Sequence, residues 1–161
     1  MSVLEKIYAK AKQDPQKVAF PEAHNEKIMQ AAYECAKEGY IRSILVGNVE
    51  QLKALAAERG YEESAFTFVD LNDEAYKNEL IAKYVALPTS RLKEKALARR
   101  MADPLNFACV MQAVDEADVT FAGIDYTTGD VILAGQMIVG LQENLDTISS
   151  IGLCDIPGYE G

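Results

Sequence analysis

The chain has 161 residues, of which 49% are hydrophobic and 25% charged, and this composition is typical of one globular domain with a buried core. No apolar run approaches the ~20 residues that a membrane span needs, and the N-terminus alternates charges where a signal peptide would be apolar, which argues against a membrane partner and against export. A formal net charge of −9 opposes general binding to nucleic acid, because such binding depends on clustered Lys and Arg.

The cysteines and the single histidine indicate neither a disulfide framework nor a metal site. Cys35, Cys109 and Cys154 are odd in number and far apart, and His24 is the one histidine. Cys109 lies on an apolar helical face, where we expect it to pack as a small hydrophobic residue. We therefore expect a cytoplasmic protein without a bound metal.

Residues 1–70 alternate between helical and strand patterns. Apolar residues recur at helical spacing in three segments, and Gly39 and Gly60 follow two of them as stop signals. The expected helices are residues 2–13, 25–37 and 47–59, and the expected strands are residues 17–20, 43–46 and 66–69. This order predicts an α/β fold, a three-layer α-β-α sandwich with a mainly parallel sheet.

Binding sites in such sheets lie at the carboxyl ends of the strands. The loops that follow the expected strands are therefore the first places to look for a site. Three loops meet this condition, namely residues 21–25, 47–48 and 123–130.

The second half of the chain begins with consecutive helices. We expect helices over residues 73–87, 89–101, 104–116 and 129–141, and strands over residues 119–122 and 147–155. The helix at residues 129–141 is apolar on nearly every side, so we expect it to lie under the sheet, with Gly135 allowing close backbone approach. Residues 1–146 then form an N-terminal α/β domain, and residues 147–161 begin a second α/β domain that is otherwise absent from this chain.

The turn at Thr127, Thr128, Gly129 and Asp130 joins the fourth expected strand to its helix. The first amides of a helix have no intrahelical acceptor and sit at the positive end of the helix dipole, so this turn can bind phosphate or carboxylate. The simpler interpretation is a helix cap, with Thr127 as N-cap and Asp130 three residues later. Both interpretations remain open from these residues alone.

One basic stripe interrupts this acidic chain. Arg91, Lys95 and Arg99 are spaced by four residues in the expected helix over residues 89–101 and so share a face. Such a stripe is usually a solvated face. The alternative is phosphate binding by an arginine, and Arg91, beside the break at Pro88, is best placed to reach a cleft.

Several other chemistries lack their sequence signals. The chain contains no G-x-S-x-G motif to accompany a histidine relay, no G-x-x-x-x-G-K-[ST] P-loop, and no G-x-G-x-x-G after a strand. Serine hydrolase and nucleotide triphosphatase activities are therefore weakly supported.

Five segments in order resemble landmarks of the phosphotransacetylases (phosphate acetyltransferases). They are KVAFPEAHNEKIMQAAYECAKEG, SILVGN, DPLNFACVMQAVDEADVTFAG, YTTGDV and TISSIGL, and together they cover nearly the whole chain from Lys17 onward. The resemblance implies reversible transfer of an acetyl group between coenzyme A and inorganic phosphate, which gives acetyl phosphate. It also implies that acyl-CoA and phosphate or acyl phosphate are the partners, with coenzyme A a substrate and no bound cofactor.

The resemblance places the reaction in a cleft between two α/β domains. In family members a carboxylate deprotonates the coenzyme A thiol, and basic and hydroxyl groups hold the phosphate and the developing oxyanion. Those catalytic groups belong to a C-terminal half that this chain lacks, so the catalytic residues are unknown here and this fragment alone is expected to be inactive. On this side of the cleft the resemblance places Thr127, Thr128, Ser149 and Ser150 nearest the substrates, with Arg91 a further candidate.

Two positions depart from the family pattern. Many members have His where this chain has Tyr126, and Arg where it has Leu133. The alternatives are therefore a phosphate butyryl- or propionyltransferase, or a truncated, non-catalytic domain that only binds or dimerises. Apolar surface left exposed by a missing domain favours self-association, so we expect a homo-oligomer such as a homodimer.

Overall fold

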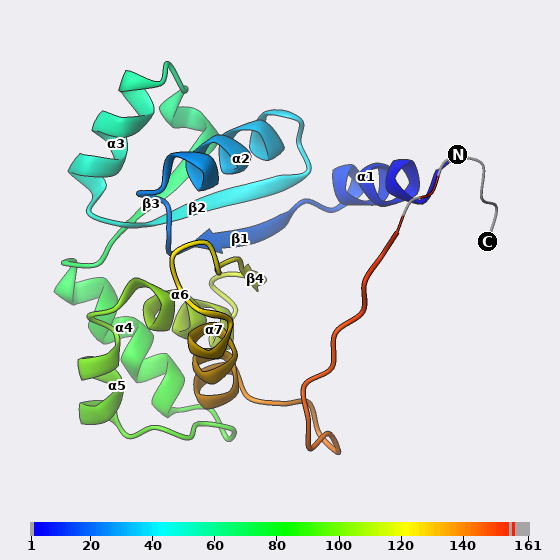
Figure 1. Cartoon of the computed structure of the whole chain (residues 1–161). Coiled ribbons are helices and arrows are strands. Elements are labelled where there is room, and N and C mark those ends of the chain that lie inside the picture. Colours follow the sequence, from blue (N-terminus) through cyan, green and yellow to red (C-terminus); the bar gives the residue numbers. More distant parts are fainter. Residues whose placement is uncertain (1, 155, 157–161) are drawn as a thin grey trace.

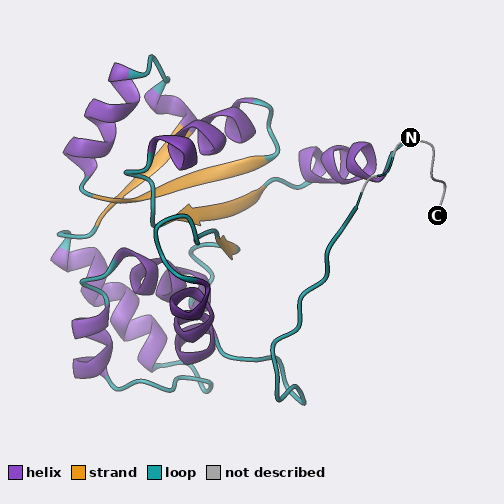
Figure 2. Cartoon of the chain, viewed as in Figure 1, coloured by secondary structure: helices purple, strands orange, loops and turns teal. Residues whose placement is uncertain are grey.

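Four parallel strands form one sheet (Figure 1) in a computed structural model that describes residues 2–154 and 156. The strands are β1 (Gln16–Phe20), β2 (Ile41–Gly47), β3 (Phe66–Asp70) and β4 (Val119–Thr120). Their order across the sheet is β3-β2-β1-β4 (Figure 2), and each neighbouring pair is parallel. The predicted parallel sheet is confirmed.

The direction in which strands are added to the sheet reverses at β1. Strands β2 and β3 follow one another on one side of β1, whereas β4 pairs with the other side, where Val18 lies opposite Val119. In an open parallel sheet, a crevice forms outside the carboxyl ends of the strands at such a reversal. The loops that follow β1 and β4 are therefore neighbours.

Alternating side chains of the central strands pack on two faces. Val18 and Leu45 belong to one buried cluster, and Ala19 and Val46 belong to another on the opposite face. The first cluster includes residues of α2 (Glu26–Lys37) and α3 (Val49–Glu58). The second includes residues of the helices that follow β3, so helices cover both faces and the three-layer prediction is confirmed (Figure 1).

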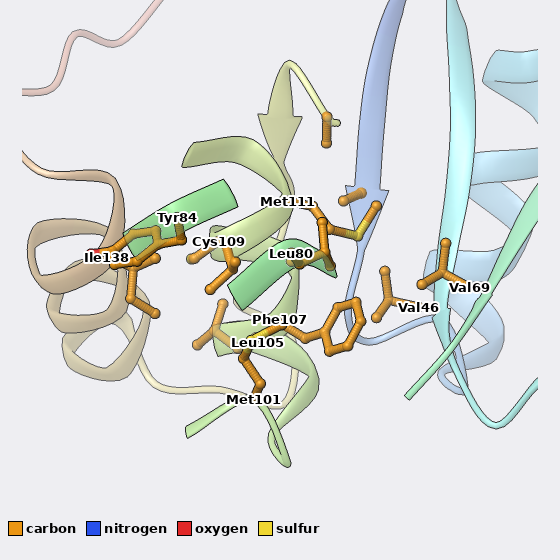
Figure 3. Close-up of a cluster of buried hydrophobic side chains, with 14 of the residues drawn as sticks. Val46, Val69, Leu80, Tyr84, Met101, Leu105, Phe107, Cys109, Met111 and Ile138 are labelled. Carbon is orange, nitrogen blue, oxygen red and sulfur yellow. The ribbon is translucent and has the colours of Figure 1, made fainter. Parts of the chain in front are cut away.

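Helix α6 is the centre of the second helical layer. Its Phe107 is fully buried and points toward Val46 of the sheet, while Ile138 lies beside Tyr84 farther from the sheet (Figure 3). The layer contains α4 (Glu74–Val85), α5 (Glu94–Arg100), α6 (Pro104–Ala113), α7 (Thr128–Ala134) and a π-helical segment that continues α7 (Gly135–Val139).

Side-chain caps confirm four of the predicted helix starts. Each capping side chain accepts a hydrogen bond from a backbone amide in the first turn, which satisfies a group that the helix itself leaves unpaired. The capping residues are Asn25 of α2, Asn48 of α3, Asp73 of α4 and Asp103 of α6. Gly39 and Gly60 follow α2 and α3 with φ of +76° and +70°, as glycine stop signals require.

Three predicted boundaries in the second half are wrong. The helix expected over residues 89–101 begins only at Glu94, because the chain after Pro88 first forms a turn in which the Ser90 amide donates to the Leu87 carbonyl over 3.1 Å. Helix α6 ends at Ala113, where Asp115 takes a left-handed φ of 62°. Strand β4 covers only Val119–Thr120, although the Phe121 amide still donates to the Ala19 carbonyl of β1 over 2.9 Å.

The helix predicted to lie under the sheet does not lie there. Helix α7 and its π-helical extension pack on α6, because α6 already occupies that face of β1 and β2. Leu133 is 54% exposed, and Ile132 is exposed as well. No heavy atom lies within 4 Å of the position that a Cβ would take on Gly135, so the predicted close approach is wrong.

The two ends of the described chain extend beyond the layers. Helix α1 (Val3–Gln13) projects from the start of β1, and residues 141–154, orange to red in Figure 1, run out of the helical layer without helix or strand. The strand predicted over residues 147–155 is thus absent from residues 147–154, and Asp155 lies outside the described residues. The second domain expected from residue 147 stays a prediction. Every helix among residues 2–154 and 156 is too short or too polar to span a bilayer.

We expect Gly135→Ala to stabilise the fold by about 0.5–1 kcal/mol, because the new methyl group meets open space and the unfolded chain loses freedom. Gly135 has helical angles, φ −58° and ψ −50°, that alanine adopts without strain. The measurement is the free energy of unfolding in urea. Gly39→Ala is the control: it also enters open space, but its φ of +76° should cost about 1–2 kcal/mol. A loss of stability in Gly135→Ala would contradict the placement of α7.

Candidate functional site

A buried carboxylate joins the loop after β1 to the loop after β4. The Glu22 side chain is 0% exposed. Its oxygens accept hydrogen bonds from the backbone amides of Gly123 (2.7 Å), Ile124 (3.2 Å), Asp125 (2.5 Å) and Tyr126 (2.8 Å). We call this arrangement the Glu22 clamp. It fixes the conformation of residues 123–126 at the reversal of strand order.

The charge of Glu22 is stabilised by these amides. Burial alone would raise the pKa of the carboxyl group, but the four backbone hydrogen bonds outweigh it and hold the pKa below its usual value of 4.5. The amides are fixed backbone dipoles, and their hydrogen bonds stabilise the buried negative charge of Glu22 without a cationic partner. Gly123 reaches the carboxylate with a φ of +121°, which side-chain-bearing residues rarely adopt.

Three further contacts hold the clamped loop. The Asp125 carboxylate lies 3.2 Å from Nε2 of His24 and accepts a hydrogen bond from Nδ2 of Asn25 over 3.3 Å. The Tyr126 hydroxyl donates to Oδ2 of Asp103 over 2.8 Å. Burial, followed by this bond to a carboxylate, raises the pKa of Tyr126, so the phenol remains a donor. The loop is therefore tied to α2 and α6 as well as to β1.

The turn at the start of α7 is a capping box. The Asp130 amide donates to Oγ1 of Thr127 over 3.2 Å, and the Thr127 amide and hydroxyl both donate to Oδ2 of Asp130. The capping interpretation is thus confirmed. Thr128 is exposed beside it, and in the part of the chain that the structure describes its hydroxyl makes no hydrogen bond.

Arg91 lies away from this turn. Its Nη1 donates to the carbonyl of Gln136 over 3.1 Å, in the π-helical extension of α7. Thr128 and Gln136 are separated by roughly 12 Å of helix at 1.5 Å per residue. The prediction that Arg91 shares a helical face with Lys95 and Arg99 is also wrong, because Arg91 precedes the start of α5 at Glu94.

Ser149 and Ser150 are exposed within residues 141–154, which run away from the α7 turn in Figure 1. The structure thus groups Thr127 with Thr128 but brings neither the two serines nor Arg91 to them.

Cys109 is buried, and burial raises the pKa of its thiol to about 11, so the expectation that it packs as a hydrophobic residue is confirmed. Among the described residues, no three His, Cys, Asp or Glu side chains gather where they could hold a metal ion.

Two of the three predicted loops meet around a hollow at the carboxyl ends of β1, β2 and β3. It has a volume of about 370 Å³. Pro21 and His24 line it from the first loop, and Gly47 and Asn48 from the second. We call it the carboxyl-edge hollow. A second hollow of about 320 Å³ lies against the α7 turn and is lined by Arg100, Tyr126, Asp130 and Leu133 among others.

Sequence reasoning missed the role of Glu22. The residue was visible in the Phe-Pro-Glu segment at the end of a strand, but an acidic residue there is normally exposed unless it is paired. Its partners lie about 100 residues away in the chain, so the local pattern could not name them.

Comparison with known proteins places these features in a family. The family model described as phosphate acetyl/butaryl transferase matches residues 2–160. A phosphate acetyltransferase from Acetivibrio thermocellus is 26% identical over 160 residues, which cover 99% of this chain and 48% of that protein. One from Clostridium acetobutylicum is 26% identical over 167 residues, covering 100% of this chain and 50% of that protein. The chain spans about half the length of these curated relatives.

Solved structures confirm the fold. The EutD phosphotransacetylase from Staphylococcus aureus matches with a TM-score of 0.78 at 19% identity, over 89% of this chain and 44% of that one. A phosphotransacetylase from Streptococcus pyogenes matches with a TM-score of 0.73 at 20% identity, over 86% of this chain and 43% of that one. The α/β architecture of this chain therefore corresponds to part of each longer structure.

We expect Glu22→Gln to lower the free energy of unfolding at neutral pH by roughly 2–4 kcal/mol, because it removes the charge and turns an amide NH₂ toward backbone donors. The folded-state pKa of Glu22 lies below 4.5, so its contribution to stability is complete above that value and is lost as the pH falls through the folded-state pKa. The difference between wild type and variant should therefore shrink in acid.

The measurement is urea unfolding of both proteins from about pH 7 to about pH 3. Glu62→Gln, at an exposed carboxylate, is the control and should change stability by less than about 0.5 kcal/mol. A constant difference between wild type and Glu22→Gln across this range would contradict the clamp.

Proposed function

Because the chain belongs to the phosphate acetyl/butaryl transferase family, we propose that it forms the N-terminal side of a phosphate acetyltransferase. The reaction is the reversible conversion of acetyl-CoA and phosphate to acetyl phosphate and coenzyme A. The observation that carries the proposal is the family match over residues 2–160, supported by relatives that are phosphate acetyltransferases.

The chemistry needs groups from both sides of a cleft. In the direction of acetyl-CoA synthesis, a base takes the thiol proton of coenzyme A, the thiolate sulfur bonds to the acyl carbon, and the carbon–oxygen bond to phosphate breaks after an oxyanion has formed. We assign the base and the cationic groups to the half of the relatives that this chain does not span. The catalytic residues of the present half therefore remain unassigned.

On the present side we assign substrate contacts to the α7 turn. The Glu22 clamp holds the backbone of residues 123–126, and the Thr127 capping box fixes the start of α7, so the backbone that carries the exposed Thr128 hydroxyl is held in place at the strand reversal. Rigid positioning of a donor is what stabilises a developing oxyanion or a phosphate.

Ser149, Ser150 and Arg91 are weaker members of the proposed site. Each lies apart from the α7 turn in this chain, and each would need the second half to bring it near substrate.

Cytoplasmic location and a homodimer remain part of the proposal. Exposed apolar residues on α1 and in residues 141–154, including Ile151 at 95% exposure, support burial against another domain or a second copy.

A longer acyl group is the second candidate, and the hollow beside the α7 turn favours it. Leu105, Leu133 and Ala134 give this hollow of about 320 Å³ an apolar side, and Tyr126 contributes its ring. Leu133 stands where many family members have Arg, so this chain presents a hydrocarbon at that place. Butyryl or propionyl chains gain more from such a surface than acetyl does.

The test is phosphate-dependent release of coenzyme A from acetyl-, propionyl- and butyryl-CoA. We expect no turnover by residues 1–161 alone and turnover after mixing with a separately expressed C-terminal half of the same protein. Turnover by the chain alone would contradict the assignment of the catalytic groups to the other half. No turnover after mixing, with both halves folded, would favour a non-catalytic binding domain.

We expect Leu133→Arg to lower the KM for phosphate about tenfold in the mixed enzyme, because a charge-assisted hydrogen bond is worth about 1.5–3 kcal/mol and exposure weakens it. Leu133 is 54% exposed, so the longer side chain fits without repacking. Ile132→Arg is the matched control: it adds the same charge at the neighbouring exposed position, which does not line this hollow, and should leave the KM unchanged. Equal effects in the two variants would indicate a general charge effect instead of a phosphate contact.

A further inference from the structure

The π-helical extension of α7 stops before its hydrogen-bond ladder reaches the Gln136 carbonyl. The Gly140 amide donates to the Gly135 carbonyl over 2.9 Å, and this five-residue spacing is that of a π-helix. The Leu141 amide would continue the ladder to Gln136, but within the described residues it makes no such hydrogen bond. A carbonyl at the end of a helix then needs a partner from elsewhere.

Arg91 is that partner. Its Nη1 donates to the Gln136 carbonyl over 3.1 Å, from a position 45 residues earlier in the chain. The guanidinium group also lies against Gly140, because a Cβ placed on Gly140 would be 3.4 Å from Nη2 and 3.6 Å from Nε of Arg91. A cation at this end of a helix is favoured by the helix dipole as well as by the hydrogen bond. Arg91 therefore caps the extension.

The cap is itself anchored to the helical layer. The backbone amide of Arg91 donates to the Tyr84 hydroxyl over 3.4 Å. Tyr84 is a buried residue of α4, and it lies beside Ile138 of the extension in Figure 3. The loop that carries Arg91 and the extension that Arg91 caps thus contact the same buried side chain.

Gly140 is the point at which the chain leaves this support. Its φ of +87° and ψ of −178° form a combination that residues with a side chain rarely adopt. Two hollows of about 370 and 350 Å³ lie beside Arg91, and Leu141 lines both of them. The backbone is therefore held up to Gly140 and has open space around it from Leu141 onward.

We propose that Arg91 is a positioning residue that fixes the end of the α7 extension, and that Gly140 is the pivot at which residues 141–154 change direction. Both parts of this device lie in residues 1–161, so it can be measured without turnover. Its consequence for catalysis rests on the proposed function, in which residues 141–154 lead toward the second half of the enzyme. There, Arg91 sets where that half can begin its approach to the α7 turn.

The experiment is backbone ¹⁵N relaxation and amide hydrogen exchange of the isotope-labelled chain. We expect order parameters near about 0.85 up to Val139 and below about 0.6 at Leu141 and Gln142. Arg91→Met keeps a long side chain but removes every donor. In this variant the drop should move back toward Gly135, and the Gly140 amide should exchange about tenfold faster.

Two further arginine variants separate the cap from a general effect. Arg91→Lys keeps the charge and a donor, so it should restore most of the protection of the Gly140 amide. Arg99→Met makes the same substitution as Arg91→Met at an exposed arginine of α5 and should leave that amide unchanged. The amides of α6 should exchange at the wild-type rate in all three variants.

Gly140→Ala tests the other half of the device. The new methyl group disfavours a φ of +87° and touches the guanidinium group, so the variant should free the end of the extension as Arg91→Met does. The double variant should show no further acceleration of exchange, because both changes remove one contact. Gly152→Ala is the control in the same segment, since its methyl group meets open space.

A wild-type rate of Gly140 exchange in Arg91→Met, or order parameters that stay high through Gln142 in the wild type, would overturn the inference. Faster exchange throughout α6 in Arg91→Met would overturn it as well, because Arg91 would then support the whole layer. Additive effects in the double variant would show that Arg91 and Gly140 act separately. The expected dynamics with no turnover after mixing the two halves would support the inference and contradict the proposed function alone.

Discussion

The Glu22 clamp is the interaction on which the candidate site depends. A carboxylate buried at the end of β1 would be costly by itself, and it is tolerated here because four backbone amides of residues 123–126 point at it. The loop after β1 supplies the carboxylate, and the loop after β4 supplies the amide donors that this carboxylate needs. The strand order places the loops side by side, and the clamp turns that proximity into a fixed geometry from which α7 starts.

Contacts through the helical layer connect the clamped loop to the sheet. Tyr126 donates to Asp103, and Asp103 also caps α6 through its bond from the Asn106 amide, so the clamped loop and the central helix share one carboxylate. Helix α6 in turn packs against the sheet through Phe107. The α7 turn is therefore positioned by buried contacts on several elements, although the turn itself is exposed. This arrangement suits the substrate contacts that we propose for the α7 turn.

Much of the fold could be predicted because local patterns determine it. Asn48 and Asp103 begin helices, and Gly39 ends one, for reasons contained in a few neighbouring residues. The candidate site was harder to predict than the fold, because its residues contact partners that are distant in the sequence. Glu22 and Gly123 are 101 residues apart, and the apolar character of α7 did not show that α6 already occupied the sheet face. The pattern after Pro88 predicts a helix that includes Arg91, whereas α5 starts later, at Glu94.

The most direct test of the clamp is an acid titration of the isotope-labelled chain followed at the amides of Gly123, Ile124, Asp125 and Tyr126. These protons face a carboxylate and should lie far downfield at neutral pH. The account predicts that all four move upfield together with one midpoint below 4.5, the midpoint of Glu22 itself. Four amides that titrate separately, or that do not respond in this range while the chain stays folded, would contradict it.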